Sequence, residues 1–202
     1  MSAHPLYFLR HGETAWNFER RMQGQIDIPL NETGHGQAKA MAAGLYAAEP
    51  DAVAKGFSFH VSPLTRTRET MSYVQKHYDL DDNALVIDER LMEINFGDCE
   101  GKTWPEIDKI APDREADPVA YYDWTPEGGE SHAVAEDRVR AWYNDLTGPT
   151  IVVAHGGISR ILRGFVLDLA KTETLQLKVP QTKFFRLTGA AIDWFDAKHS
   201  DA

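Results

Sequence analysis

The order of apolar and polar residues along the chain predicts strands that alternate with helices. Short apolar runs that fit buried strands lie at 6–9, 57–61, 85–87 and 151–154. Between and after them, apolar residues recur at helical spacing over 31–49, 62–78, 131–146 and 158–169. Such alternation is typical of an α/β protein with a mostly parallel sheet. The tail, 183–187 and 191–195 around Gly189, fits a hairpin and predicts an antiparallel edge.

Polar residues and a proline predict where the helices begin. Thr33 is the expected N-cap of the helix over 31–49. Ser62 and Pro63 fit the N-cap and first residue of the helix that follows the second strand. The helix after Ser131 is predicted to present one face made of Val134, Ala135, Arg138, Trp142 and Leu146.

Three stretches have no strong periodicity. We interpret 15–30, which contains a glycine and a proline, as an ordered loop. A short helix fits 103–110. The connection 111–126 is rich in proline and aspartate and carries two tyrosines and a tryptophan. These aromatic residues either form part of a lid that selects substrate or cover the core.

Composition narrows the class of protein. The 202 residues, 43% hydrophobic and 26% charged, fit a single domain over 1–202. No apolar run approaches the ~20 residues of a membrane span, and the first five residues lack the pattern of a signal peptide. Cys99 is the only cysteine, so a reducing, cytoplasmic location is expected. The net charge of −10 argues against nucleic acid or an anionic membrane as partner but allows a small phosphorylated substrate.

Two of the predicted strands end in a histidine followed by glycine. The first strand runs into Arg10-His11-Gly12, and the strand 151–154 runs into His155-Gly156-Gly157. Ligands bind beyond the carboxyl ends of parallel strands, so both histidines are expected at one edge of the sheet. Taken alone, the first strand end fits an anion site and a solvated loop equally well.

Two further side chains fit the same site. Arg66 lies in the first turns of a helix, where an exposed cation opposes the helix dipole by roughly 0.3–1 kcal/mol unless an anion binds there. Glu93 lies among apolar neighbours, which would desolvate its carboxyl and favour the protonated form of a general acid. The alternatives are a solvated arginine and a structural carboxylate that pairs with an arginine.

The loop after the first strand adds weaker candidates. Asn17 could donate an amide hydrogen bond back over the site, and Gln23-Gly24 could bring backbone N–H groups close to a ligand. Considered alone, each fits an ordinary surface loop better.

Together these residues have the parts that phosphoryl transfer needs. A neutral His11 could attack phosphorus if a backbone carbonyl holds the proton on its other nitrogen. Nearby arginines disfavour the imidazolium. Arg10 and Arg66 could chelate the phosphate, and His155 could donate to an equatorial oxygen. Glu93 could protonate the leaving group and later activate water. No Cys/His cluster or metal motif is present, so no metal and no cofactor is expected.

Four segments resemble the signatures of the histidine phosphatase superfamily, in its phosphoglycerate mutase-like branch. They are Arg10-His11-Gly12-Glu13-Thr14, Ser62-Pro63-Leu64-Thr65-Arg66, Leu91-Met92-Glu93-Ile94-Asn95-Phe96-Gly97 and His155-Gly156-Gly157. The resemblance implies a three-layer α/β/α sandwich that works without metal. It implies that His11 is phosphorylated and that Glu93 donates the proton. It also implies a phosphate pocket formed by Arg10, Arg66 and His155. The other residues expected to bind substrate or phosphate are Thr14, Asn17, Gln23, Gly24 and Gly156.

The same resemblance favours a phosphatase. Mutases of the branch usually carry a longer insert with a basic, aromatic substrate-gripping motif, whereas 101–129 here is short and acidic. The segments after Glu93 look more like the small broad-specificity and α-ribazole phosphatases. A phosphoglycerate mutase and a non-catalytic module that binds phosphorylated ligands remain the alternatives. The sequence does not decide between a monomer and a homodimer.

Overall fold

A six-stranded sheet forms the centre of the computed structural model, which describes residues 4–197. In chain order the strands are β1 (Leu6–Arg10), β2 (Ser58–Val61), β3 (Leu85–Ile87), β4 (Thr150–Ala154), β5 (Lys183–Thr188) and β6 (Ala191–Asp196). They are arranged in the order β3-β2-β4-β1-β5-β6. The first four of these are parallel, while β5 pairs antiparallel with β1 and β6 antiparallel with β5. The predicted parallel sheet with an edge hairpin is confirmed.

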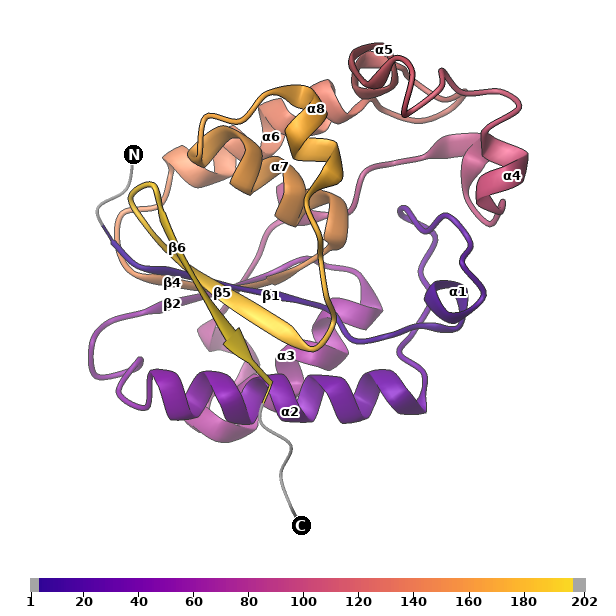
Figure 1. The fold of residues 1–202 in the computed structure, drawn as a ribbon. Coiled ribbons are helices and arrows are strands. Elements are labelled where there is room, and N and C mark those ends of the chain that lie inside the picture. The colour runs from indigo at the N-terminus through magenta and orange to yellow at the C-terminus, as the bar shows by residue number, and fades with distance from the viewer. Residues whose placement is uncertain (1–3, 198–202) are drawn as a thin grey trace.

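Helices cover both faces of this sheet. The α-helices are α1 (Ala15–Phe18), α2 (Glu32–Ala48), α3 (Thr65–Tyr78), α4 (Trp104–Ile107), α5 (Pro118–Asp123), α6 (His132–Asn144), α7 (Gly156–Val166) and α8 (Lys171–Gln176). Three 3₁₀ turns span Asp82–Ala84, Glu89–Leu91 and Gly97–Cys99. Figure 1 shows α2 and α3 below the sheet and α6, α7 and α8 above it, with α1, α4 and α5 grouped to one side. This is the expected three-layer sandwich.

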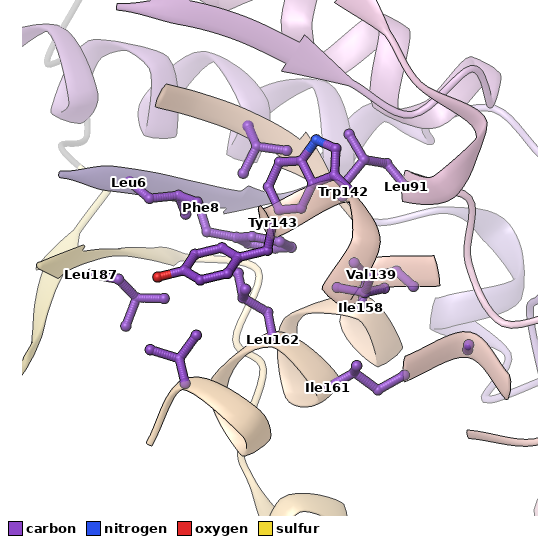
Figure 2. Close-up of a cluster of buried hydrophobic side chains, with 14 of the residues drawn as sticks. Leu6, Phe8, Leu91, Val139, Trp142, Tyr143, Ile158, Ile161, Leu162 and Leu187 are labelled. Atoms are coloured by element: carbon purple, nitrogen blue, oxygen red, sulfur yellow. The ribbon is translucent and has the colours of Figure 1, made fainter. Parts of the chain in front are cut away.

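The two-residue period of the strands divides the core into two layers. In β1, Leu6 and Phe8 face α6 and α7, and Figure 2 shows them packed with Trp142 and other apolar side chains of those helices. Tyr7 and Leu9 face the opposite layer, which α2 and α3 supply. Arg10 continues the alternation of Leu6 and Phe8, and this places its side chain on the α7 side of the sheet.

Two helix starts differ from the prediction. Asn31 caps α2, because its side-chain oxygen accepts the N–H of Gly34 at 2.8 Å, and Thr33 lies exposed inside the first turn. Helix α3 begins at Thr65, because the Asp27 carboxylate from a distant loop accepts the Thr65 N–H at 2.9 Å. The hydroxyl of Ser62 accepts the N–H of Leu64 only at 3.5 Å and has a closer partner, which lies in the site described below.

Three other expectations also need correction. The predicted loop 15–30 contains the short helix α1, which Thr14 caps, and the connection 111–126 contains α5. On α6 the buried face is rotated from the predicted one: Val134 is 53% exposed, and the buried residues include Val139 and Tyr143. Among residues 4–197, no helix is long and apolar enough to cross a membrane.

Candidate active site

The two strand-end histidines lie side by side. Because β1 and β4 are adjacent and parallel, Arg10 pairs with Ala154 in register, and the His11 N–H donates to the Ala154 carbonyl at 3.0 Å. The rings of His11 and His155 meet edge to face, with centroids 5.2 Å apart. The expected meeting of these residues at one edge of the sheet is therefore confirmed.

His11 is held in one neutral form. Its Nδ1 donates to the Gly12 carbonyl at 2.7 Å, which leaves the Nε2 lone pair free. Burial, together with the neighbouring guanidinium groups of Arg66 and Arg10, lowers the pKa of His11 well below its usual range. Of these causes of the lowered pKa, the sequence indicated the arginines but not burial, which is the larger one.

Gly12 packs against the backbone at the start of α2. A Cβ on Gly12 would lie 2.2 Å from the carbonyl oxygen of Gly34, at the start of α2. The loop after β1 thus rests directly on the backbone of that helix. The small size of Gly12 is what allows this contact between the two backbones.

His155 lies beneath the cavity and already has two partners. Its Nδ1 accepts from Nε of Arg66 at 3.3 Å, so the neutral ring carries its proton on Nε2 and donates it to the Ser62 hydroxyl at 2.7 Å. Its side chain has no exposed surface. Burial and the Arg66 charge lower the pKa of His155 well below its usual range. The Nε2 proton, which the sequence led us to expect on a phosphate oxygen, is donated to Ser62 in this arrangement, and the donation to phosphate stays a prediction.

Arg10 lines the cavity, whereas Arg66 lies beneath it. Arg66 has no exposed surface and donates to the carbonyls of Gly24 at 2.6 Å and Ile26 at 3.2 Å. Arg10 lines the cavity; its Nη1 donates to the Val179 carbonyl at 2.7 Å, while its buried Nε has no partner within the described chain. Burial lowers the pKa of each guanidinium to about 10, so both remain charged at neutral pH.

Glu93 is buried at the N-terminus of α7. Its Oε1 accepts the N–H of Ile94 at 3.0 Å, and its Oε2 accepts the N–H of Gly157 at 2.9 Å. The apolar neighbours Leu91 and Ile94 are fully buried, as the pattern predicted. The sequence did not indicate the helix terminus, whose N–H groups add favourable partners for a carboxylate.

The loop residues form a continuous network. Thr14 Oγ1 donates to Gln23 Oε1 at 2.8 Å, and Asn17 Nδ2 donates to the same oxygen at 3.1 Å. The Gln23 Nε2 group is buried and has no partner among the described residues. Gly24 faces away from the cavity, towards Arg66 and Glu100.

One cavity of about 730 Å³ collects most of the candidates. Arg10, His11, Asn17, Gln23, Glu93 and Gly156 line it, whereas Thr14, Gly24, Arg66 and His155 do not and form the layer beneath. Five arginines and two carboxylates line the cavity, although the whole chain has a net charge of −10. The arginines are Arg10, Arg20, Arg21, Arg114 and Arg160.

The segment 111–126 contributes to both the cavity and the core. Arg114, Glu115, Pro118 and Tyr121 line the cavity, so the segment does cover the site. Tyr122 is buried, and its hydroxyl bonds to Glu136. The aromatic residues of the segment thus divide between the cavity, which Tyr121 lines, and the core, which Tyr122 covers, while the selection of substrate by this segment stays a prediction.

Several contributors had no assigned role from the sequence. Arg160 and Gln181 line the cavity, and Arg138 donates to the carbonyls of Met92 and Glu93. The signal available for Gln181 was its place just before an antiparallel strand, which starts where the neighbouring parallel strand ends. For Arg160 it was the position one helical turn after His155 and Gly156.

No group of three or more metal-ligating side chains occurs among residues 4–197.

Known proteins resemble this chain in both sequence and fold. The sequence profile of the histidine phosphatase superfamily (branch 1) matches residues 6–196. A glucosyl-3-phosphoglycerate phosphatase of Mycolicibacterium vanbaalenii is 33% identical over 84% of this chain and 76% of its own. A probable phosphoglycerate mutase GpmB of Serratia proteamaculans is 31% identical over 94% and 86%. A solved mycobacterial glucosyl-3-phosphoglycerate phosphatase in complex with VO3 is similar in fold, with a TM-score of 0.75 at 30% identity, covering 98% of this chain and 100% of that one.

Proposed function

The chain belongs to the histidine phosphatase superfamily, and on that premise we propose that it is a metal-independent phosphomonoesterase acting on small phosphorylated metabolites through a phosphohistidine on His11. The observation that carries the proposal is the state of His11. Its proton is fixed on Nδ1 by the Gly12 carbonyl, and its Nε2 faces a cavity lined by unpartnered donors of Arg10 and Gln23.

The reaction proceeds in two displacements. Nε2 of His11 attacks phosphorus, the bond from phosphorus to the ester oxygen breaks, and Glu93 gives its proton to that oxygen. The Glu93 carboxylate then takes a proton from water as the water oxygen attacks the phosphohistidine. Phosphate leaves, and His11 regains its lone pair. Arg10 and Gln23 bind the equatorial oxygens throughout.

The substrate is proposed to carry a second acidic group. Arg160 lines the cavity and donates from Nε to the Leu177 carbonyl at 2.9 Å, and no carboxylate of the described chain forms an ion pair with it. The excess of arginines over carboxylates favours a ligand with more charge than one phosphate supplies. Similar proteins named for glucosyl-3-phosphoglycerate support a phosphorylated carboxylic acid as the class.

A phosphoglycerate mutase is the second candidate. Similar proteins named as probable phosphoglycerate mutases favour it, and a cavity of about 730 Å³ has room for a bisphosphorylated ligand. The two activities share the phosphohistidine and differ in what accepts the phosphoryl group, which is water in one and a second hydroxyl in the other.

The decisive experiment follows the fate of the phosphoryl group. Purified protein is incubated with 3-phosphoglycerate, with and without a trace of 2,3-bisphosphoglycerate, and with an aryl phosphate. The phosphatase releases inorganic phosphate equally in EDTA and in added divalent metal. Efficient formation of 2-phosphoglycerate with little free phosphate would establish the mutase instead.

Labelling identifies the nucleophile. Rapid quenching with ³²P-substrate should trap an acid-labile phosphoenzyme, and His11→Ala should abolish both label and turnover. His35→Ala is the matched control, because His35 lies on α2 and contacts Tyr73 outside the cavity. Normal labelling of His11→Ala would refute the assignment. Release of no phosphate from any ester would favour a non-catalytic phosphate-binding module.

A cytoplasmic location belongs to the same proposal. It is supported by the single cysteine of the sequence, Cys99, which is buried and reduced.

A further inference from the structure

We propose that Gln181 is a positioning residue: together with the backbone N–H of Thr14, it holds a chain of three side-chain amides so that the last one presents an N–H donor to the phosphate. The inference rests on the proposed phosphate site, because Gln181 acts on the phosphate only through the other two amides. The three amides are those of Gln181, Asn17 and Gln23.

Each amide in the chain donates to the next. Gln181 Nε2 donates to Asn17 Oδ1 at 2.9 Å, and Asn17 Nδ2 donates to Gln23 Oε1 at 3.1 Å. Gln23 is 9% exposed, and its Nε2 is a buried donor without a partner in residues 4–197. Buried donors are nearly always satisfied, so this one marks a place for an acceptor. The side chain lines the cavity beside His11 and Arg10, where the phosphate oxygens would lie.

The direction of the chain is set by groups that cannot reverse. The backbone N–H of Thr14 donates to Asn17 Oδ1 at 3.3 Å, which identifies that atom as the oxygen. The opposite atom of Asn17, Nδ2, can only donate, so the Gln23 atom that it meets is Oε1, and the Thr14 hydroxyl gives its proton to the same oxygen. Two donors thus converge on Gln23 Oε1 and turn the Gln23 NH₂ group away, towards the cavity.

Gln181 is held where it can act on this chain. It ends the strap, the segment Leu177–Gln181 between α8 and β5. Three successive carbonyls of the strap, those of Leu177, Lys178 and Val179, each accept from an arginine at 2.7–2.9 Å. The third of these arginines is Arg10, so the strap and the phosphate site share a side chain. Gln181 Nε2 also lies 3.4 Å from the His11 carbonyl.

The test changes the polarity of Gln181 with little change of shape. Gln181→Glu places lone pairs in place of the NH₂ group, opposite the lone pairs of Asn17 Oδ1. The repulsion turns the Asn17 amide over, so that its NH₂ group faces the new carboxylate, the bond from the Thr14 N–H is lost and the carbonyl of Gln23 turns to the cavity. Binding of orthovanadate and of inorganic phosphate, measured by calorimetry, should weaken about tenfold or more, because a hydrogen bond to an anion is lost or replaced by repulsion.

Two further variants separate this role from others. Gln176→Glu adds the same charge to the same cavity without touching the amide chain. The extra loss of anion affinity in Gln181→Glu, compared with Gln176→Glu, is the effect of reversing the amides. Gln181→Ala removes the donor but leaves the Thr14 N–H to orient Asn17, so its loss should be only about two- to threefold. In turnover, KM should rise with the anion dissociation constant while kcat changes less, since Gln23 contacts the phosphate before and during reaction.

The outcomes decide the inference independently of the reaction. Equal losses in Gln181→Glu and Gln176→Glu would overturn it, as would a larger loss in Gln181→Ala than in Gln181→Glu, which a purely structural role predicts. Failure of the wild type to bind either anion would also overturn it. A wild type that binds vanadate but turns over no ester would refute the proposed function and leave the binding comparison valid. Melting temperatures check that the half-buried substitution leaves the fold intact.

Discussion

Glu93 and Gly157 are joined by a hydrogen bond of 2.9 Å from the backbone N–H of Gly157 to Oε2 of Glu93. The bond links the 3₁₀ segment before Glu93 to the first turn of α7, and so fixes the carboxyl relative to the strand-end histidines. It also makes the position of the carboxyl depend on the absence of a side chain at 157.

Gly157→Ala should lower activity more than stability. Its Cβ would lie 2.4 Å from Oε1 of Glu93, so the carboxyl must move, and a shift of about 1 Å at a reacting group costs up to about 100-fold in rate. We expect kcat to fall at least tenfold with KM nearly unchanged. Gly36→Ala is the matched control: nothing lies within 4 Å of its Cβ inside α2, and it should stabilise the fold by about 1 kcal/mol without changing kcat. Equal kcat in both variants would contradict the assignment.

Glu93→Gln should affect esters according to their leaving groups. Alkyl phosphates need a proton on the departing oxygen, whereas a nitrophenolate leaves without one, and a general acid contributes about 100- to 10,000-fold. Steady-state kinetics on a series of phosphate esters should therefore give a steeper dependence on leaving-group pKa in the variant. Parallel lines for wild type and variant would remove the proton-donor role.

Arg160→Gln should discriminate between substrates. If Arg160 binds the second acidic group, kcat/KM for a phosphorylated carboxylic acid such as 3-phosphoglycerate should fall about 10- to 100-fold, as expected for a lost charged hydrogen bond. An aryl phosphate with no acidic group besides the phosphate should lose no more than about threefold. Arg140→Gln, on the surface of α6 and paired with Glu136, serves as control. Equal losses on both substrates would mean that Arg160 supports the site without selecting the substrate.

The fold should lose stability in mild acid because of its buried histidines. Burial lowers the pKa of His132 to about 4, from an ordinary value of 6.5. Between these values the unfolded chain binds a proton that the folded chain does not, so the free energy of unfolding falls as pH decreases, by about 1.4 kcal/mol per pH unit for each such histidine. His11 and His155 add to this slope, since their pKa values are also lowered. Urea unfolding from pH 7 to 5 measures how steeply the free energy of unfolding depends on pH. His132→Gln should reduce that slope by the contribution of one histidine, about 1.4 kcal/mol per pH unit. An unchanged slope in the variant would contradict the burial argument.

The sequence predicted most of what lies along the strands. The apolar runs 6–9 and 151–154, each followed by a histidine, were sufficient to place His11 and His155 at one edge of a parallel sheet, because ligand-binding residues gather beyond the carboxyl ends of such strands. The motif order then indicated the family.

What the sequence did not predict depends on contacts between distant segments. Asp27 provides the cap of α3, which left Ser62 to bond with His155, and neither pairing has a local signal. Likewise, the burial of Arg66, which was expected to chelate the phosphate, has no local signal, since its partners Ile26 and Gly24 come from a loop 40 and 42 residues earlier. The amide of Gln181 reaches Asn17 across 164 positions of sequence.

Because Gly12 and Gly34 are in contact, the substitutions that one position tolerates depend on the other. A Cβ on Gly12 would meet the Gly34 carbonyl oxygen at 2.2 Å, and a Cβ on Gly34 would meet the Glu13 carbonyl oxygen at 2.0 Å. Neither position can gain a side chain while the other keeps its place, so both are closed to substitution for the same reason. The start of α2 is therefore under the same steric restriction as the loop that holds the nucleophile.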